Sequence, residues 1–380
     1  MNLILFYHTL VSDWNHGNAH FLRGIVSELI SRGHRVRVYE PDQSWSRCNL
    51  LAQHGPGADT EVFDHYPQLQ SVSRRYDPAS LDLDQALDQA DLVLVHEWND
   101  PELVAAIGAH RRQSDYRLIF HDTHHRSVSD PKAMAAYDLR DYDGVLAFGE
   151  VISELYRSNG WARAVWTWHE AADTRLFFPR EAARDADLVW IGNWGDGERE
   201  RELRRFLFNP IRRLGLAASL YGVRYPQAAL SAAAHAGAIY HGWLPNYQVP
   251  ERFARHRVTV HVPRGPYARR LPGIPTIRPF EALACGIPLI CSPWEDSEGL
   301  FRPGKDFLTV RNEDEMVRHL KSVLHDPELA RDLACNGLER VRARHTCAHR
   351  VDELLSIHAS LEPVRRPQRH PPPPISKETA

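Results

Sequence analysis

Short apolar runs alternate with amphipathic segments along most of the chain. Residues 3–7 form a continuous apolar run, and Phe21, Ile25 and Leu29 then recur at helical spacing before the next strand, expected at 35–39. A strand, a helix and a strand within about forty residues predict a parallel crossover unit. The pattern therefore predicts an α/β protein with doubly wound parallel sheets.

The same alternation continues to about residue 345, with one interruption. Residues 179–186 are polar and unpatterned, which is typical of a boundary between domains. Residues 40–85 show scattered Pro, Gly, Asp and His, and we interpret them as an irregular connection on the acceptor side. Further strands are expected at 92–96, 117–121, 144–148, 164–168, 187–192, 220–222, 258–264 and 289–291, and helices at 101–112, 150–159, 198–214, 249–256, 312–325, 327–344 and 347–361.

Composition narrows the class of protein. The 380 residues are 43% hydrophobic and 25% charged, which is typical of soluble globular proteins and sufficient for two domains. The net charge of −3 gives no overall attraction to nucleic acid or membrane, although a local basic patch stays open. No apolar run is long enough to span a membrane. The odd number of cysteines, at 48, 285, 291, 335 and 347, predicts reduced thiols and a cytoplasmic protein.

The most informative stretch lies at 274–291, which predicts a loop, a short helix and a buried strand. The free N–H groups at a helix N-terminus favour an anion such as a diphosphate, so the backbone of Thr276, Ile277 and Arg278 is a candidate site. Glu281, one turn into the helix, would accept hydrogen bonds from a vicinal diol such as ribose. The alternative is an ordinary capped helix with a solvated glutamate.

Two glycine-rich turns add to this prediction. Gly17 lies where the first strand meets the first helix, in a loop expected to face the cleft. The loop at 193–197 opens a helix whose first turn carries Arg199, and a cation there is favourable if an anion sits beside it. The charged run at 198–202 is otherwise a solvated, self-paired surface.

A polar cluster follows the strand expected at 117–121. His121 and Asp122 stand at its carboxyl end, where a rigid scaffold commonly carries catalytic groups. Two other interpretations remain: a metal site made with His124 and His125, or a plain hydrogen-bonded loop.

The run at 278–290 resembles the nucleotide-sugar signature of GT-B glycosyltransferases, in particular retaining mannosyl- and glucosyltransferases of the spore-maturation type. The resemblance extends over residues 1 to about 345. It implies domains at 1–170 and 171–345 and a helix at 346–361 crossing back to the first domain. Residues 362–380 contain four consecutive prolines at 371–374 and cannot bury a core, so we expect a disordered or polyproline II tail. The resemblance also implies contacts of His121 with the donor sugar, of Gly17 with the donor phosphates, of Arg199 with the leaving diphosphate, of Glu281 with the ribose, and of Gly242, Trp243 and Leu244 with the base.

The chain departs from this family pattern in two places. Asn193 stands where an arginine is common, so Arg264 or Arg278 would supply that charge. Position 273 is Gly, where many retaining relatives carry a second glutamate. The stereochemical outcome is therefore open, and Asp122 is the candidate base if the reaction inverts.

The predicted activity is transfer of a sugar from a nucleoside diphosphate sugar to an acceptor hydroxyl, without a metal or other cofactor, because arginines and helix N-termini can neutralise the diphosphate. A nucleotide-sugar epimerase and a non-catalytic nucleotide-binding module are the alternatives. The acceptor is open among sugar, lipid, protein and nucleic-acid hydroxyls.

Overall fold

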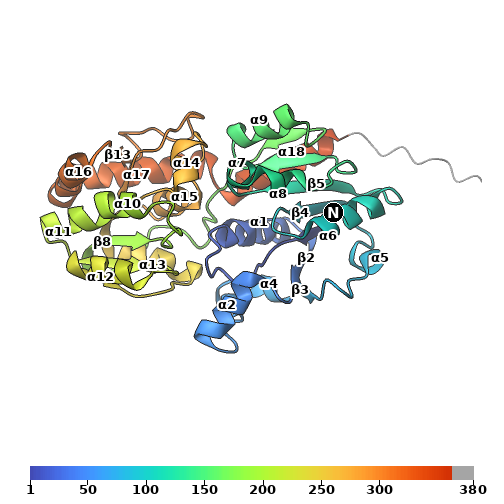
Figure 1. Ribbon diagram of the computed structural model, residues 1–380, viewed down its shortest axis with the longest axis horizontal. Coiled ribbons are helices and arrows are strands. Elements are labelled where there is room, and N and C mark those ends of the chain that lie inside the picture. Colours follow the sequence, from blue (N-terminus) through green and yellow to red (C-terminus); the bar gives the residue numbers. More distant parts are fainter. Residues whose placement is uncertain (362–380) are drawn as a thin grey trace, which may run out of the picture.

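The computed structural model describes residues 1–361, so the predicted tail at 362–380 lies outside the described residues. These residues form two lobes, each built on one parallel sheet with helices on both sides (Figure 1). Strands of the first sheet fall within residues 2–167 and strands of the second within 186–309. The expected α/β architecture of two facing doubly wound domains is confirmed.

The N-terminal sheet has the strand order β3-β2-β1-β4-β5-β6-β7, with every pairing parallel. The chain reverses direction across the sheet between β1 and β4, which is where open α/β sheets bind ligands. The strands are β1 (Asn2–Phe6), β2 (Arg35–Pro41), β3 (Ser73–Tyr76), β4 (Leu92–His96), β5 (Arg117–Asp122), β6 (Gly144–Ala147) and β7 (Val165–Thr167). The helices are α1 (Ala19–Ser31), α2 (Trp45–His54), α3 (Val62–His65), α4 (Pro67–Gln70), α5 (Leu83–Ala86), α6 (Pro101–Arg111), α7 (Arg126–Ser129), α8 (Pro131–Ala135) and α9 (Glu150–Asn159).

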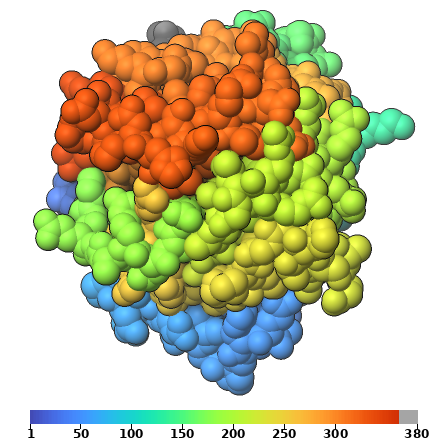
Figure 2. Space-filling model, turned by 90° about the vertical axis from the view of Figure 1, so that its left-hand side faces the viewer, coloured from blue at the N-terminus to red at the C-terminus, as the bar shows by residue number. Residues whose placement is uncertain are grey.

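The C-terminal sheet has the order β10-β9-β8-β11-β12-β13 and is also parallel. Its strands are β8 (Ala186–Ile191), β9 (Ala218–Tyr221), β10 (Ala238–Tyr240), β11 (His256–His261), β12 (Leu289–Cys291) and β13 (Leu308–Thr309). Its helices are α10 (Glu200–Leu203), η1 (Arg204–Phe208), α11 (Asn209–Leu214), α12 (Gln227–His235), η2 (Asn246–Gln248), α13 (Val249–Ala254), α14 (Gly265–Arg269), α15 (Ile277–Ala284), α16 (Glu313–His325) and α17 (Pro327–Arg344). Figure 2 looks onto this lobe, with the orange-red segment that contains α16 and α17 lying above the green and yellow segments.

One sequence prediction for the N-terminal half is wrong. Residues 40–85 are not an irregular connection, because they contain four short helices and the edge strand β3. Strand β3 has only one buried residue, Tyr76, so its sequence has no apolar alternation that would identify it as a strand.

The last helix, α18 (Cys347–Ser360), packs against α1 of the N-terminal lobe (Figure 1). Its buried side chains Cys347, Val351 and Leu354 share a core with Phe21 and Ile25 of α1. The helix that follows the C-terminal sheet therefore completes the core of the other domain.

Candidate functional site

A cavity of about 510 Å³ lies between the two lobes and is lined by both. Its N-terminal wall comes from the segments that follow β1, β4 and β5, and from α2. Its C-terminal wall comes from the segments that follow β8, β9 and β11, and from the start of α15. The cavity therefore sits at the carboxyl ends of both parallel sheets, where this fold class binds its ligands.

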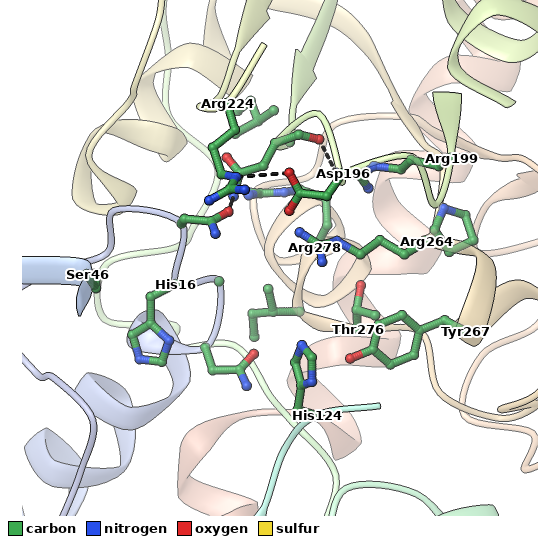
Figure 3. Close-up of a pocket in the computed structure, with 18 of the residues that line it drawn as sticks. His16, Ser46, His124, Asp196, Arg199, Arg224, Arg264, Tyr267, Thr276 and Arg278 are labelled. Atoms are coloured by element: carbon green, nitrogen blue, oxygen red, sulfur yellow. Dashed lines mark hydrogen bonds and ion pairs between the residues drawn. The ribbon is translucent and has the colours of Figure 1, made fainter. Parts of the chain in front are cut away.

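The C-terminal wall is cationic. Arg199, Arg224, Arg264 and Arg278 all line the cavity, together with one carboxylate, Asp196. Asp196 is already paired with Arg224 at 2.9 Å. Figure 3 shows Arg264 and Arg278 near each other on this wall, with His16 and His124 on the opposite side of the cavity.

Arg199 is a buried cation for which no carboxylate partner is found among the described residues. Its guanidinium donates to the carbonyl oxygen of Val262 at 2.8 Å and to that of Asn193, lies over the Trp190 ring, and leaves Nε without a partner. Burial, with the nearby Arg264 charge, lowers the pKa of Arg199 to about 10, so it stays protonated at neutral pH. A buried, unpaired positive charge on a cavity wall is energetically costly and is relieved by a bound anion.

Backbone geometry at the start of α15 adds to this anion site. Thr276 has φ of 59° and caps the helix with no side-chain hydrogen bond, so no side chain occupies the first-turn N–H groups. Thr276, Ile277 and Arg278 line the cavity as the sequence predicted, and Gly17, Asn193, Arg199 and Arg264 do so too.

Glu281 does not reach the cavity and is fully buried. Its Oε1 accepts hydrogen bonds from His20 Nδ1 and from Asn246 Nδ2, both at 2.7 Å, and its Oε2 pairs with Arg278. Burial alone would raise the pKa of this carboxyl, but Arg278 and the two hydrogen bonds lower it below its usual value. The predicted contact of Glu281 with the ribose stays a prediction, and the contacts of its side chain in the structure are those with His20, Asn246 and Arg278.

His20 connects Glu281 to the rest of the molecule. Its Nε2 accepts a hydrogen bond from the backbone N–H of Asp173 at 2.7 Å, so Nδ1 carries the proton that is donated to Glu281. The ring also stacks on Phe177 at 3.9 Å. Helix α1, the segment between the domains and α15 therefore meet at one carboxylate, an arrangement that the sequence analysis missed because His20 lies 261 residues from Glu281.

His121 and Asp122 are fully buried and do not line the cavity. Consecutive strand residues point to opposite faces of a sheet. The His121 ring accordingly packs near Trp168, with centroids 4.9 Å apart, whereas Asp122 accepts a hydrogen bond from the Tyr156 hydroxyl at 3.0 Å. The predicted contacts of these two side chains with the substrates stay predictions, and the residue of this segment that does line the cavity is His124.

Gly242, Trp243 and Leu244 also lie outside the cavity lining. The Gly242 carbonyl accepts from the N–H of Gly222 at 2.8 Å, and Trp243 Nε1 donates to Asp13 of the N-terminal domain at 3.1 Å. In this arrangement the turn predicted to hold the base contacts the facing domain, and its role in base binding stays a prediction.

Across residues 1–361 there is no group of three or more His, Cys, Asp or Glu side chains placed to hold a metal ion. The rings of His124 and His125 pack against each other, with centroids 3.9 Å apart and planes tilted by 34°, whereas the His121 ring packs edge-on against Trp168. None of the described helices could cross a membrane.

Solved structures with the same architecture are glycosyltransferases. The chain resembles HepE of Anabaena in complex with UDP-glucose with a TM-score of 0.66 and 14% identity, covering 95% of this chain and 100% of that one. Sucrose-phosphate synthase from Thermosynechococcus elongatus gives a TM-score of 0.63 at 14% identity, covering 94% and 98%. An alpha-glucosyltransferase in complex with UDP and DNA gives 0.65 at 12% identity, covering 94% and 99%. These likenesses establish the GT-B fold.

Part of the sequence matches a family model. Residues 199–356 match the model of the glycosyl transferase-like family. This match lies within a chain whose fold is that of the GT-B glycosyltransferases. No curated protein sequence matches the chain.

Proposed function

We propose that the protein binds a nucleoside diphosphate sugar in the cavity between its lobes and transfers the sugar to an acceptor hydroxyl. The observation that carries the proposal is Arg199, a buried cation without a carboxylate partner among the described residues, on the same cavity wall as Arg264 and Arg278. The solved structures of HepE and of the alpha-glucosyltransferase hold UDP-glucose and UDP, which supports a nucleotide of this kind here.

In this reaction the bond between the anomeric carbon and the diphosphate oxygen breaks, and the diphosphate leaves with an additional negative charge. Cations that are already fixed near the leaving oxygen stabilise this charge in the transition state, because their side chains do not have to move during the reaction. Arg199 and Arg264, with Arg278 at the start of α15, are placed to do so. We propose that these arginines neutralise the diphosphate as a metal ion does in other diphosphate sites, so that transfer requires no metal.

We further propose that the configuration of the sugar is retained. An inverting reaction uses a base on the acceptor side to accept the proton of the attacking hydroxyl. Among the described residues, the N-terminal wall presents no carboxylate to the cavity. Its histidines are weak bases, because burial lowers the pKa of His8 to about 4 and that of His124 well below its usual value.

Glu281 could bind the ribose only by exchanging one of its present partners. His20 and Asn246 come from different elements, so opening the domains would release His20 and leave Asn246 in place. We propose that the ribose hydroxyls replace His20 on Oε1 when the donor binds. The diphosphate assignment does not depend on this exchange.

The test is thermal unfolding with a panel of nucleoside diphosphates, each in the presence and absence of EDTA. We expect stabilisation by at least one diphosphate, unchanged by EDTA, and lost in Arg199→Ala. Arg201→Ala is the matched control, because Arg201 is an exposed arginine of α10, the helix that Arg199 immediately precedes. Stabilisation that needs a divalent ion, or that survives in Arg199→Ala, would contradict the assignment.

Mass spectrometry of donor and products then separates transfer from its alternatives. A glycosyltransferase releases nucleoside diphosphate and forms a glycosylated acceptor, an epimerase releases an altered sugar, and a binding module releases nothing. NMR of the new anomeric centre determines whether configuration is retained.

A further inference from the structure

The N-terminal wall of the cavity differs chemically from the C-terminal wall. Besides glycine and serine, its described lining residues are aromatic or carry neutral amides and imidazoles, and none is Lys, Arg, Asp or Glu. Burial lowers the pKa values of His8, His16 and His124, so these rings are neutral at physiological pH. This wall therefore presents hydrogen-bonding groups without charge.

Three of these residues form a compact group that we call the aromatic platform: His8, Trp98 and His124. The Trp98 ring lies 5.0 Å from the His124 ring and 6.1 Å from the His8 ring, measured between centroids. They follow β1, β4 and β5, which are adjacent in the sheet, so the platform spans the switch point of the N-terminal domain.

Trp98 is both exposed and rigidly held. Its side chain is 38% exposed, although large hydrophobic side chains are usually covered in folded domains. The guanidinium of Arg126 lies 4.4 Å from the ring centroid and is itself fixed by Glu97 at 2.8 Å. An indole that is supported on one side by a fixed cation and exposed to a cavity is a prepared surface for a ligand.

We propose that the aromatic platform is the acceptor subsite and that the acceptor is a neutral saccharide, whose pyranose ring stacks on Trp98. This inference rests on the proposed sugar transfer and names the class of acceptor for it. A pyranose has an apolar C–H face that stacks on indole, and a rim of hydroxyls that exchange hydrogen bonds with neutral imidazoles and amides. His8, His124 and Asn18 supply such groups on the same wall.

The charges of the cavity argue against other acceptors. A nucleic acid binds chiefly through its phosphates, which require Lys or Arg along the strand. Among residues 1–361, the arginine that contacts the platform is Arg126, which is already paired with Glu97. The cavity arginines lie on the opposite wall, where we place the donor diphosphate. A lipid chain would require a continuous apolar groove, whereas this wall alternates aromatic and polar side chains.

The experiment measures saccharide binding and donor binding separately on the full-length protein. Ligand-observed NMR screens neutral mono- and oligosaccharides, sulfated oligosaccharides and a short single-stranded DNA against wild type, Trp98→Ala and Trp98→Phe. Thermal shift with nucleoside diphosphates on the same samples reports donor binding and folding. Trp161→Phe is the control, because Trp161 packs on Tyr156 and does not line the cavity.

We expect a neutral saccharide to bind wild type, with affinity reduced about tenfold in Trp98→Ala and partly retained in Trp98→Phe, because a stacked aromatic contact contributes up to about 1.4 kcal/mol. The diphosphate shift should be equal in all four proteins. In turnover assays the same substitutions should raise the acceptor KM and leave the donor KM unchanged.

Three results would overturn the inference: binding of DNA or sulfated oligosaccharide in preference to every neutral one, neutral saccharide binding that Trp98→Ala does not alter, or no saccharide binding by a protein that binds diphosphate. If Trp98→Ala does not fold, Trp98→Phe and the fluorescence change of Trp98 on saccharide addition decide the matter. Loss of the diphosphate shift in wild type would refute the proposed function instead, so the two failures are distinguishable.

Discussion

The two walls of the cavity arise in the same way but differ in charge. Each is formed by the segments that follow the strands of a parallel sheet, at the edge where such sheets bind ligands. The C-terminal wall carries Arg199, Arg264 and Arg278, whereas the N-terminal wall carries His8, Trp98 and other uncharged groups. The fold therefore determines where ligands bind, and the charge of each wall determines which substrate that wall can bind.

Beneath the C-terminal wall, two buried charges show a second difference. Glu281 has a partner for both of its oxygens, whereas Arg199 has only carbonyl oxygens and an aromatic ring around it. A paired buried charge contributes to the structure, and an unpaired one at a cavity is available to a ligand. The two charges should accordingly respond differently to removal.

The largest effect is expected for Glu281→Ala. Removing this carboxylate leaves Arg278, His20 and Asn246 without their shared partner, and breaking a buried ion pair costs about 3–5 kcal/mol. Denaturant unfolding would measure the loss, with Glu181→Ala at an exposed position as the control. A variant as stable as the control would show that the Glu281 contacts do not hold the two domains together.

For Arg199→Ala we expect the reverse: little loss of stability but a fall in kcat/KM of about 10²–10³, which is typical of losing one transition-state charge contact. Without ligand the folded protein should lose little stability, because the substitution removes an unpaired buried charge. Arg199→Lys should recover part of the activity, since it keeps the charge without the planar fork. Equal losses of activity in Arg199→Ala and Arg201→Ala would show that the Arg199 charge has no specific role in the reaction.

Much of this architecture could be predicted from the sequence. The apolar runs that became β1, β4, β5 and β8 are short and continuous, as buried parallel strands require, and helices α9 and α17 have the expected bounds. The residues proposed to bind the diphosphate could also be chosen from the sequence, because a glycine-rich loop, a helix start and three arginines are local features. Gly17, Asn193 and Thr276 line the cavity for the same reason.

The features that sequence reasoning missed depend on tertiary packing. In the sequence, Trp98 is a single aromatic residue of a loop. It lies beside His8 and His124 because β1, β4 and β5 are neighbours in the sheet. The partners of Glu281 come from α1 and η2, far away in the chain, so its sequence context suggested an accessible carboxylate. Long-range hydrogen bonds leave no periodic signal in a sequence.

A smaller effect is expected for His20→Ala, which tests the contact between the two domains. The substitution removes one of the three partners of Glu281 and the acceptor for the Asp173 N–H, at a cost of about 1–3 kcal/mol. Titration calorimetry with the diphosphate that stabilises the wild type should show tighter binding in the variant if ribose replaces His20 on Glu281. Weaker or equal binding would mean that Glu281 stays with its protein partners and the ribose binds elsewhere.

A pH-dependent effect is expected for Glu170, another buried carboxyl. Burial, and secondarily the Glu281 charge, raise the pKa of Glu170 from its ordinary 4.5 to about 8, and its Oε1 has no hydrogen-bond partner. Because the folded pKa is the higher one, the protonated carboxyl contributes stability that is complete below pH 4.5 and is lost as the pH rises to about 8. At neutral pH Glu170 therefore adds no negative charge to offset the cationic wall.

Glu170→Gln should keep the shape of this side chain and remove its titration. We expect the free energy of unfolding of the wild type to fall relative to that of the variant by about 1.4 kcal/mol for each pH unit between pH 4.5 and pH 8, and the two to converge at acidic pH. Glu97, whose pKa burial also raises to about 8, titrates in both proteins, so only the difference between them reports Glu170. A difference that does not change with pH would mean that Glu170 is ionised in the folded protein, and the C-terminal wall would then be less cationic than its arginines indicate.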